Sequence, residues 1–103
     1  MAADKARIER RGDDAFLLSG ELNFATVPAL LREGAALFDG QGRVSLDLQQ
    51  VTRSDSAGLA LLVEWTRQAK VQGATLVFHN ITPQMLAIAQ VSGLDRILSL
   101  NEQ

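Results

Sequence analysis

Residues 43–65 decide the fold, and they read RVSLDLQQVTRSDSAGLALLVEW. From Arg43 to Leu48, apolar and polar residues alternate, which predicts a strand with one buried face. A loop is expected over residues 49–54. A helix is then predicted over residues 57–72, where apolar residues recur at helical spacing until Gly73. A strand that leads through a loop into a long helix is typical of α/β proteins.

Toward the N-terminus, the pattern predicts a hairpin followed by a helix. The expected elements are a strand over 6–11, a turn over 12–14, a strand over 15–19, a loop over 20–23 and a helix from 26 to 38. Gly12-Asp13-Asp14 has the residue types of a tight turn. Thr26 is expected to cap the helix, and Pro28 suits its first turn because a missing N–H costs nothing there.

Toward the C-terminus, a strand and a third helix are predicted. Residues 75–78 are apolar without alternation, as expected of a central strand covered on both faces. Thr82 and Pro83 open the helix, and Gly93 suits the left-handed position after its end. The predicted order is β-β-α-β-α-β-α, which indicates an α/β fold with a mixed central sheet covered by helices. We expect a single domain over residues 1–103.

The composition limits the classes of partner. Hydrophobic residues make up 47% of the chain, which is enough for a core. Lys and Arg number 10 against 12 Asp and Glu, a net charge of -2 that argues against nucleic acid or an anionic bilayer as the main partner. No apolar run approaches the roughly 20 residues of a membrane span, and no signal peptide is visible. We therefore expect a cytoplasmic protein.

The residues of common catalytic and metal sites are scarce. His79 is the one histidine and there is no cysteine, so neither a nucleophile-base pair nor a set of metal ligands is expected. His79 is interpreted as a structural residue of its strand, and Asp13-Asp14 as solvated turn residues. No glycine-rich phosphate-binding loop is present. We expect no enzyme activity, no cofactor and no metal.

The Asp55-Ser56 junction allows two interpretations. Either residue can cap the helix and satisfy the free N–H groups that follow. Alternatively, the amides and dipole of a helix N-terminus favour a phosphate, and a phosphorylated Ser56 would add negative charge beside Asp55. Gly58 exposes backbone that another chain could approach.

Leu61 and Trp65 lie one turn apart on a flank of the same helix. They either pack against a neighbouring helix or form an apolar patch that continues from Ser56. A tryptophan in such a patch is a typical anchor of a protein interface.

Motifs along nearly the whole chain resemble those of STAS domains. The four motifs are Ser19-Gly20-Glu21-Leu22, Leu46-Asp47-Leu48, Asp55-Ser56-Ala57-Gly58-Leu59 and Ser92-Gly93-Leu94. The resemblance implies the SpoIIAA-like fold of that family. Its founding members are anti-sigma factor antagonists, in which the serine after the aspartate is phosphorylated by an anti-sigma kinase. The matching residue here is Ser56, although these antagonists usually show Asp-Ser-Ser-Gly where this chain has Ala57.

Residues 56–65 and 85–93 are more similar to the STAS subunit of Mla-type phospholipid-transport ABC systems, the MlaB type. That resemblance implies a non-catalytic subunit, peripheral at the inner membrane, that binds and supports the cytoplasmic ATPase and so serves outer-membrane lipid asymmetry. The expected contacts are Asp55, Ser56, Ala57, Gly58 and Leu59, with Leu61 and Trp65 as flanking anchors. The alternative is an anti-sigma factor antagonist regulated by phosphorylation of Ser56.

Overall fold

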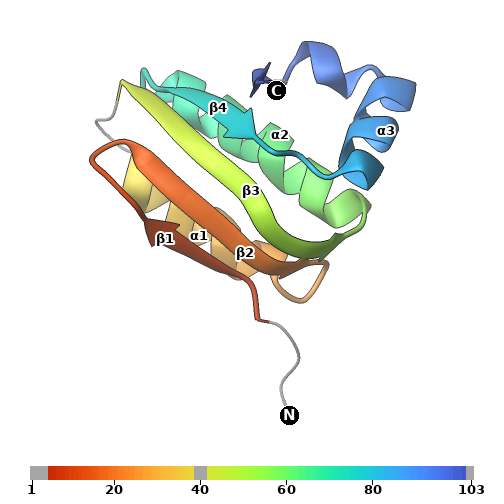
Figure 1. Ribbon diagram of the computed structural model, residues 1–103. Helices are drawn as coiled ribbons and strands as arrows, with labels where there is room; N and C mark the ends of the chain where they lie inside the picture. Colours follow the sequence, from red (N-terminus) through yellow and green to blue (C-terminus); the bar gives the residue numbers. More distant parts are fainter. Residues whose placement is uncertain (1–4, 39–41, 102–103) are drawn as a thin grey trace.

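The computed structural model describes residues 5–38 and 42–101 of the 103-residue chain. Its elements are β1 (Arg7–Arg10), β2 (Ala15–Leu22), α1 (Val27–Phe38), β3 (Arg43–Ser54), α2 (Ser56–Val71), β4 (Thr75–His79), α3 (Pro83–Ser92), the short 3-10 helix η1 (Leu94–Arg96) and β5 (Leu100–Asn101). The predicted β-β-α-β-α-β-α order is confirmed, and the structure adds η1 and β5 to it (Figure 1).

The strands form one mixed sheet in the order β1-β2-β3-β4-β5. β1 and β2 are antiparallel, as expected of a hairpin. The later neighbouring pairs are all parallel, and the helices provide the crossovers that parallel strands need. The predicted mixed α/β sheet is therefore confirmed.

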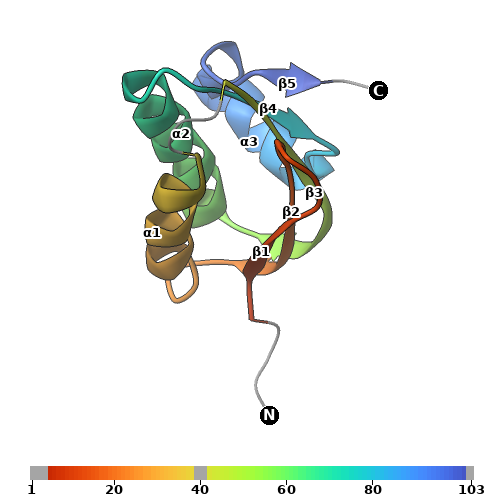
Figure 2. The ribbon, with the colours of Figure 1, turned by 90° about the vertical axis from the view of Figure 1, so that its left-hand side faces the viewer.

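The core lies between the sheet and the helices. In Figure 1, α1 and α2 lie behind the strands, and Figure 2 shows the same two layers from the side. The alternation predicted for β3 follows from this arrangement. Val44, Leu46 and Leu48 are completely buried, whereas Ser45 and Asp47 between them are half-buried on the other face.

β4 was expected to be covered on both faces, and this holds only in its middle. Leu76 and Phe78 are buried in the core, and Val77, which points to the other face, is 7% exposed. Thr75 at the start of the strand is exposed. The cover is incomplete because α1 and α2 both lie behind the sheet, and no helix of the described residues covers this second face (Figure 1).

The predicted loops over residues 20–23 and 49–54 are largely wrong, because β2 continues to Leu22 and β3 to Ser54. The two extensions pair with each other in parallel, Gly20 with Val51 and Leu22 with Ser54. Register shifts along this pair break the alternation, as β-bulges do. The two extensions satisfy each other's backbone hydrogen-bonding groups. A local sequence pattern does not predict such pairing between distant segments.

The third helix, α3, begins and ends as predicted. The Thr82 hydroxyl accepts a hydrogen bond from the Met85 amide at 3.1 Å, and Pro83 occupies the first turn. Gly93 follows the helix in the left-handed region with φ of 76°.

Candidate functional site

The junction between β3 and α2 is held by Asp55. Its carboxylate accepts a hydrogen bond from the Ala57 amide at 2.8 Å, so Asp55 is the N-cap of α2. The Asp55 amide donates to the Leu22 carbonyl at 3.3 Å, and the Gly58 amide donates to the Asp55 carbonyl at 3.0 Å. The capping interpretation is confirmed for Asp55, and the same contacts tie the junction to β2.

Ser56 is the first residue of α2, and its side chain is exposed. Among the described residues, its hydroxyl makes no hydrogen bond. The amides of Ala57 and Gly58 already have acceptors within Asp55, so they are not free to hold a phosphate. A negative charge at Ser56 would therefore be stabilised mainly by the dipole of α2.

The next three residues face inward. Ala57 is 8% exposed and Leu59 is 3% exposed. A Cβ at Gly58 would lie 2.9 Å from the Leu22 Cβ and would also collide with the Ser54 hydroxyl. The expectation that Gly58 admits another chain is therefore wrong, because its missing side chain makes room for β2 and β3 of this chain.

Leu61 and Trp65 are also core residues, 1% and 0% exposed. The Trp65 indole packs edge-on against Phe38 at 5.4 Å between ring centroids, and its Nε1 donates to the Leu31 carbonyl at 3.4 Å. It occupies the space left by Gly34 of α1. Their interpretation as surface anchors is wrong, and packing against a neighbouring helix is confirmed.

Phe24 is an exposed aromatic residue that the sequence interpretation missed. It lies between β2 and α1, and its side chain is 82% exposed. The Asn23 side chain accepts hydrogen bonds from the amides of Ala25 at 2.8 Å and Thr26 at 3.1 Å. The Thr26 hydroxyl accepts from the Asn23 amide at 2.9 Å and donates to the Glu21 carbonyl at 2.8 Å.

Thr26 lies at the N-cap position predicted for it, because it directly precedes α1 and its carbonyl accepts a hydrogen bond from the Leu30 amide at 3.3 Å. Its hydroxyl closes the preceding turn instead of bonding an amide of α1. The turn has the side-chain-to-backbone bonds that Asn and Thr favour in turns, and they fix the backbone beneath Phe24. This local pattern was readable in the sequence. The exposure of the aromatic ring was not.

The Phe24 turn and Ser56 lie at the same edge of the sheet. β2 and β3 are parallel and in register at Leu22 and Ser54, so the segments that follow both strands leave the sheet side by side. We call Phe24, Asp55 and Ser56 the junction surface. Its three side chains are exposed, whereas the remaining predicted contacts lie beneath it or in the core.

Other kinds of site have little support in the described structure. In residues 5–38 and 42–101, no group of three His, Cys, Asp or Glu side chains is placed to hold a metal ion. No helix in that part of the chain is long and apolar enough to cross a membrane. His79 is half-buried at the end of β4, and Asp13 and Asp14 are exposed in the hairpin turn.

Comparison with known proteins identifies the family. The family described as "Mlab, STAS domain" matches residues 7–100, so the chain belongs to the STAS family. The intermembrane phospholipid transport system binding protein MlaB of Escherichia coli is 32% identical over 79% of this chain and 81% of its own length. The anti-sigma-B factor antagonist of Bacillus subtilis is 24% identical over 82% of this chain and 77% of its own length.

Solved structures agree with this fold. The unphosphorylated anti-sigma factor antagonist SpoIIAA superposes with a TM-score of 0.70 at 16% identity, over 95% of this chain and 89% of its own. An anti-sigma factor antagonist from Mycobacterium paratuberculosis gives a TM-score of 0.71 at 25% identity, over 98% of this chain and 87% of its own. The predicted SpoIIAA-like fold is thus confirmed.

Proposed function

We propose that this member of the STAS family is the non-catalytic subunit of an Mla-type ABC transporter, and that it binds and supports the transporter's ATPase through the junction surface. In this role it works in the cytoplasm, peripheral at the inner membrane, and serves phospholipid transport and outer-membrane lipid asymmetry. The observation that carries the proposal is the exposed pair of Phe24 and Ser56 at one sheet edge, in a chain 32% identical to a phospholipid transport system binding protein.

The chemistry of the junction surface suits a protein partner. An aromatic side chain on a fixed turn loses little conformational entropy on binding, and aromatic residues dominate the energy of many interfaces. Ser56 is small and its hydroxyl is unengaged, so a partner group can approach the first turn of α2 closely. The Asp55 carboxylate is occupied by its cap bond and contributes mainly by holding that turn in place.

Co-purification with the ABC ATPase from the same genome tests the proposal. We expect a stable complex, which Phe24→Ala weakens by about thirtyfold or more if Phe24 is a hot spot of roughly 2 kcal/mol. Val91→Ala is the matched control because Val91 is 90% exposed on α3 and lies outside the junction surface. A chain that never binds the ATPase, or equal affinities for the two variants, would contradict the proposal.

The same complex tests the role of Ser56. Ser56→Asp places a charge on the junction surface, and we expect it to weaken ATPase binding by at least tenfold because a desolvated, unpaired carboxylate is costly. Ser99→Asp makes the same change at an exposed serine away from the junction and should bind like the parent chain. If the two variants bind equally well, Ser56 is outside the interface.

An anti-sigma factor antagonist switched at Ser56 is the second candidate. It is favoured by the Ser56 hydroxyl, which is exposed at the N-terminus of α2 and makes no hydrogen bond within the described residues. A kinase can reach this hydroxyl, and the helix dipole would stabilise the phosphate that is added. Incubation with the cognate anti-sigma kinase and ATP should add one phosphate to the parent chain. Ser56→Ala should abolish the label and Ser99→Ala should retain it. An unlabelled parent chain would remove this candidate.

A further inference from the structure

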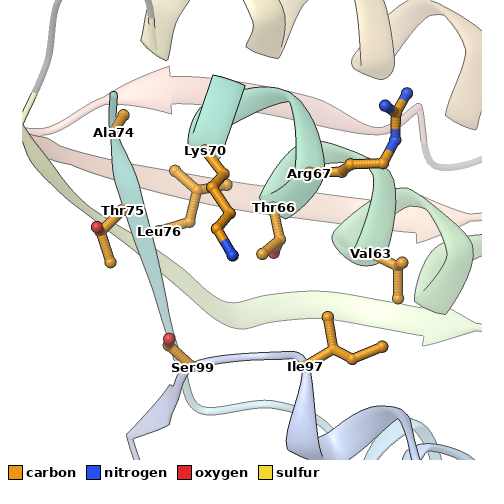
Figure 3. Close-up of a pocket in the computed structure, with 9 residues that line it drawn as sticks. All are labelled: Val63, Thr66, Arg67, Lys70, Ala74, Thr75, Leu76, Ile97 and Ser99. Atoms are coloured by element: carbon orange, nitrogen blue, oxygen red, sulfur yellow. The ribbon is translucent and has the colours of Figure 1, made fainter. Parts of the chain in front are cut away.

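A groove lies beside the C-terminal half of α2, on a part of this helix remote from Ser56. It has a volume of about 470 Å³, which lies within the range of roughly 300–1,000 Å³ of small-molecule sites. Its walls come from α2, from β4 and from the segment that joins η1 to β5. Figure 3 shows the side chains that border it.

The apolar part of the groove is formed by Val63, Leu76 and Ile97. Leu76 is 1% exposed, whereas Ile97 is 53% exposed and is one of the few large hydrophobic side chains of the described chain that are mostly exposed. Val63 and Ile97 face each other across the opening in Figure 3. A ligand with an apolar chain would therefore remove hydrophobic surface from water on both sides.

The positive charge of the groove comes from Lys70. Arg67 also borders it, but its guanidinium forms an ion pair with Glu64, with Nε donating to Oε1 at 3.1 Å, and it points away from the groove in Figure 3. The hydrogen bond from Arg67 lowers the pKa of Glu64. Carboxylate and guanidinium are both ionised at neutral pH, so the pair carries no net charge.

Lys70 has no ion pair within the described residues, and its ammonium extends toward the space between α2 and β4. The side chain of Thr66 points in the same direction. The Thr66 hydroxyl donates to the Leu62 carbonyl at 2.8 Å, so it adds no donor for an anion. The groove thus combines an apolar trough with one uncompensated positive charge.

We propose that this groove binds a medium-chain alkyl carboxylate, with its carboxylate at the Lys70 ammonium and its chain between Val63 and Ile97. A single free cation matches a monoanion, whereas a phosphate dianion would keep an unpaired charge against an apolar wall. The flexible Lys70 side chain can follow the head group while its stem covers apolar surface. This site is independent of the junction surface and of the partner that binds there.

The proposal is tested by titrating the full chain with octanoate and measuring binding by calorimetry and by amide chemical shifts. We expect saturable binding with shift changes centred on residues 63–76 and 97–99. Hexanoate, octanoate and decanoate should bind progressively more tightly, by about threefold to fourfold for each methylene that the groove covers. Lys70→Met keeps the apolar stem and removes the charge, so octanoate binding should weaken at least fivefold while binding of neutral octanol stays unchanged.

Matched variants separate this site from general association with the protein. Lys5→Met makes the same change at an exposed lysine before β1 and should leave octanoate binding unaltered. Ile97→Thr should weaken both octanoate and octanol, whereas Val91→Thr on exposed α3 should weaken neither. Non-saturable binding, shift changes outside the groove, or equal effects of Lys70→Met and Lys5→Met would each overturn the proposal.

Discussion

Two close contacts along α2, each made possible by a glycine, have opposite consequences. At the start of the helix, Gly58 lets Leu22 and Ser54 approach the backbone, and this packing leaves Ser56 exposed one layer above. Two turns later, Gly34 of α1 makes room for the indole of Trp65, and this contact is completely buried. The first contact lies beneath the exposed Ser56, and the second fills the core between α1 and α2.

The difference shows how little of the start of α2 remains exposed for the partner proposed above. From Ala57 onward, much of the apolar side of the helix is committed to the sheet or to α1. What is left for a partner at this end is the first residue of the helix and the turn that carries Phe24. Substitutions in the core contact should therefore change stability, and substitutions on the junction surface should change binding.

The largest effect is expected from Trp65→Ala. Removal of a buried indole leaves a cavity between α1 and α2, and such truncations cost about 3–5 kcal/mol of unfolding free energy. Urea denaturation measures the loss, and Trp65→Phe should recover part of it by keeping a ring against Phe38. If Trp65→Ala retained stability and lost only partner binding, the assignment of Trp65 to the core would be wrong.

A smaller loss is expected from Gly58→Ala. The added Cβ would lie 2.9 Å from the Leu22 Cβ, and overpacking of this kind costs about 1–3 kcal/mol, more than the helix propensity of alanine returns. Gly42→Ala is the matched control because a Cβ there meets nothing within 4 Å. Thermal denaturation of the two variants should place Gly58→Ala well below Gly42→Ala. Equal melting temperatures would contradict the close packing at the junction.

Asp55→Ala removes the cap of α2 and should cost about 1 kcal/mol. Asp55→Ser keeps an oxygen that can accept from the Ala57 amide, so it should restore most of the stability. Asp13→Ala, at an exposed turn residue, controls for the change in net charge. The measurement is chemical denaturation. If Asp55→Ala and Asp55→Ser lost the same free energy of unfolding, the cap bond would add little to stability.

The smallest change in stability is expected from Ser56→Asp, within about 0.5 kcal/mol of the parent chain, because the substitution lies on the surface where the helix dipole favours the charge and Asp55 opposes it. The same variant is expected to bind its partner at least tenfold more weakly. Unfolding and binding measured on one preparation make the test. A large loss of stability would mean that Ser56 belongs to the fold and not to the partner surface.

Much of this architecture could be predicted from local patterns. Alternation gave the strand that starts at Arg43, and helical spacing with Gly73 gave the extent of α2, since both periodicities are imposed by the core. The end of β3 was missed because residues 49–54 are held in the sheet by pairing with β2. That pairing depends on residues about 30 positions earlier in the chain.

The candidate site divides in the same way. Asp55 and Ser56 were found from their residue types and the family motif, and both are exposed at the predicted junction. Leu61 and Trp65 were misassigned because the flank of a helix becomes core only when another helix covers it. Phe24 was missed because its exposure depends on where the turn leaves the sheet.

The sequence by itself determined the order of the elements, the family and the position of Ser56 at the start of a helix, because these follow from short-range periodicity, capping chemistry and motif. Only the tertiary structure decided which side of α2 faces α1, that Gly58 serves packing within the chain, and that the turn carrying Phe24 leaves the sheet at the same end as Ser56. The physical reason is that burial is a property of contacts between distant segments, and the same apolar residue is an anchor or a core residue according to what covers it.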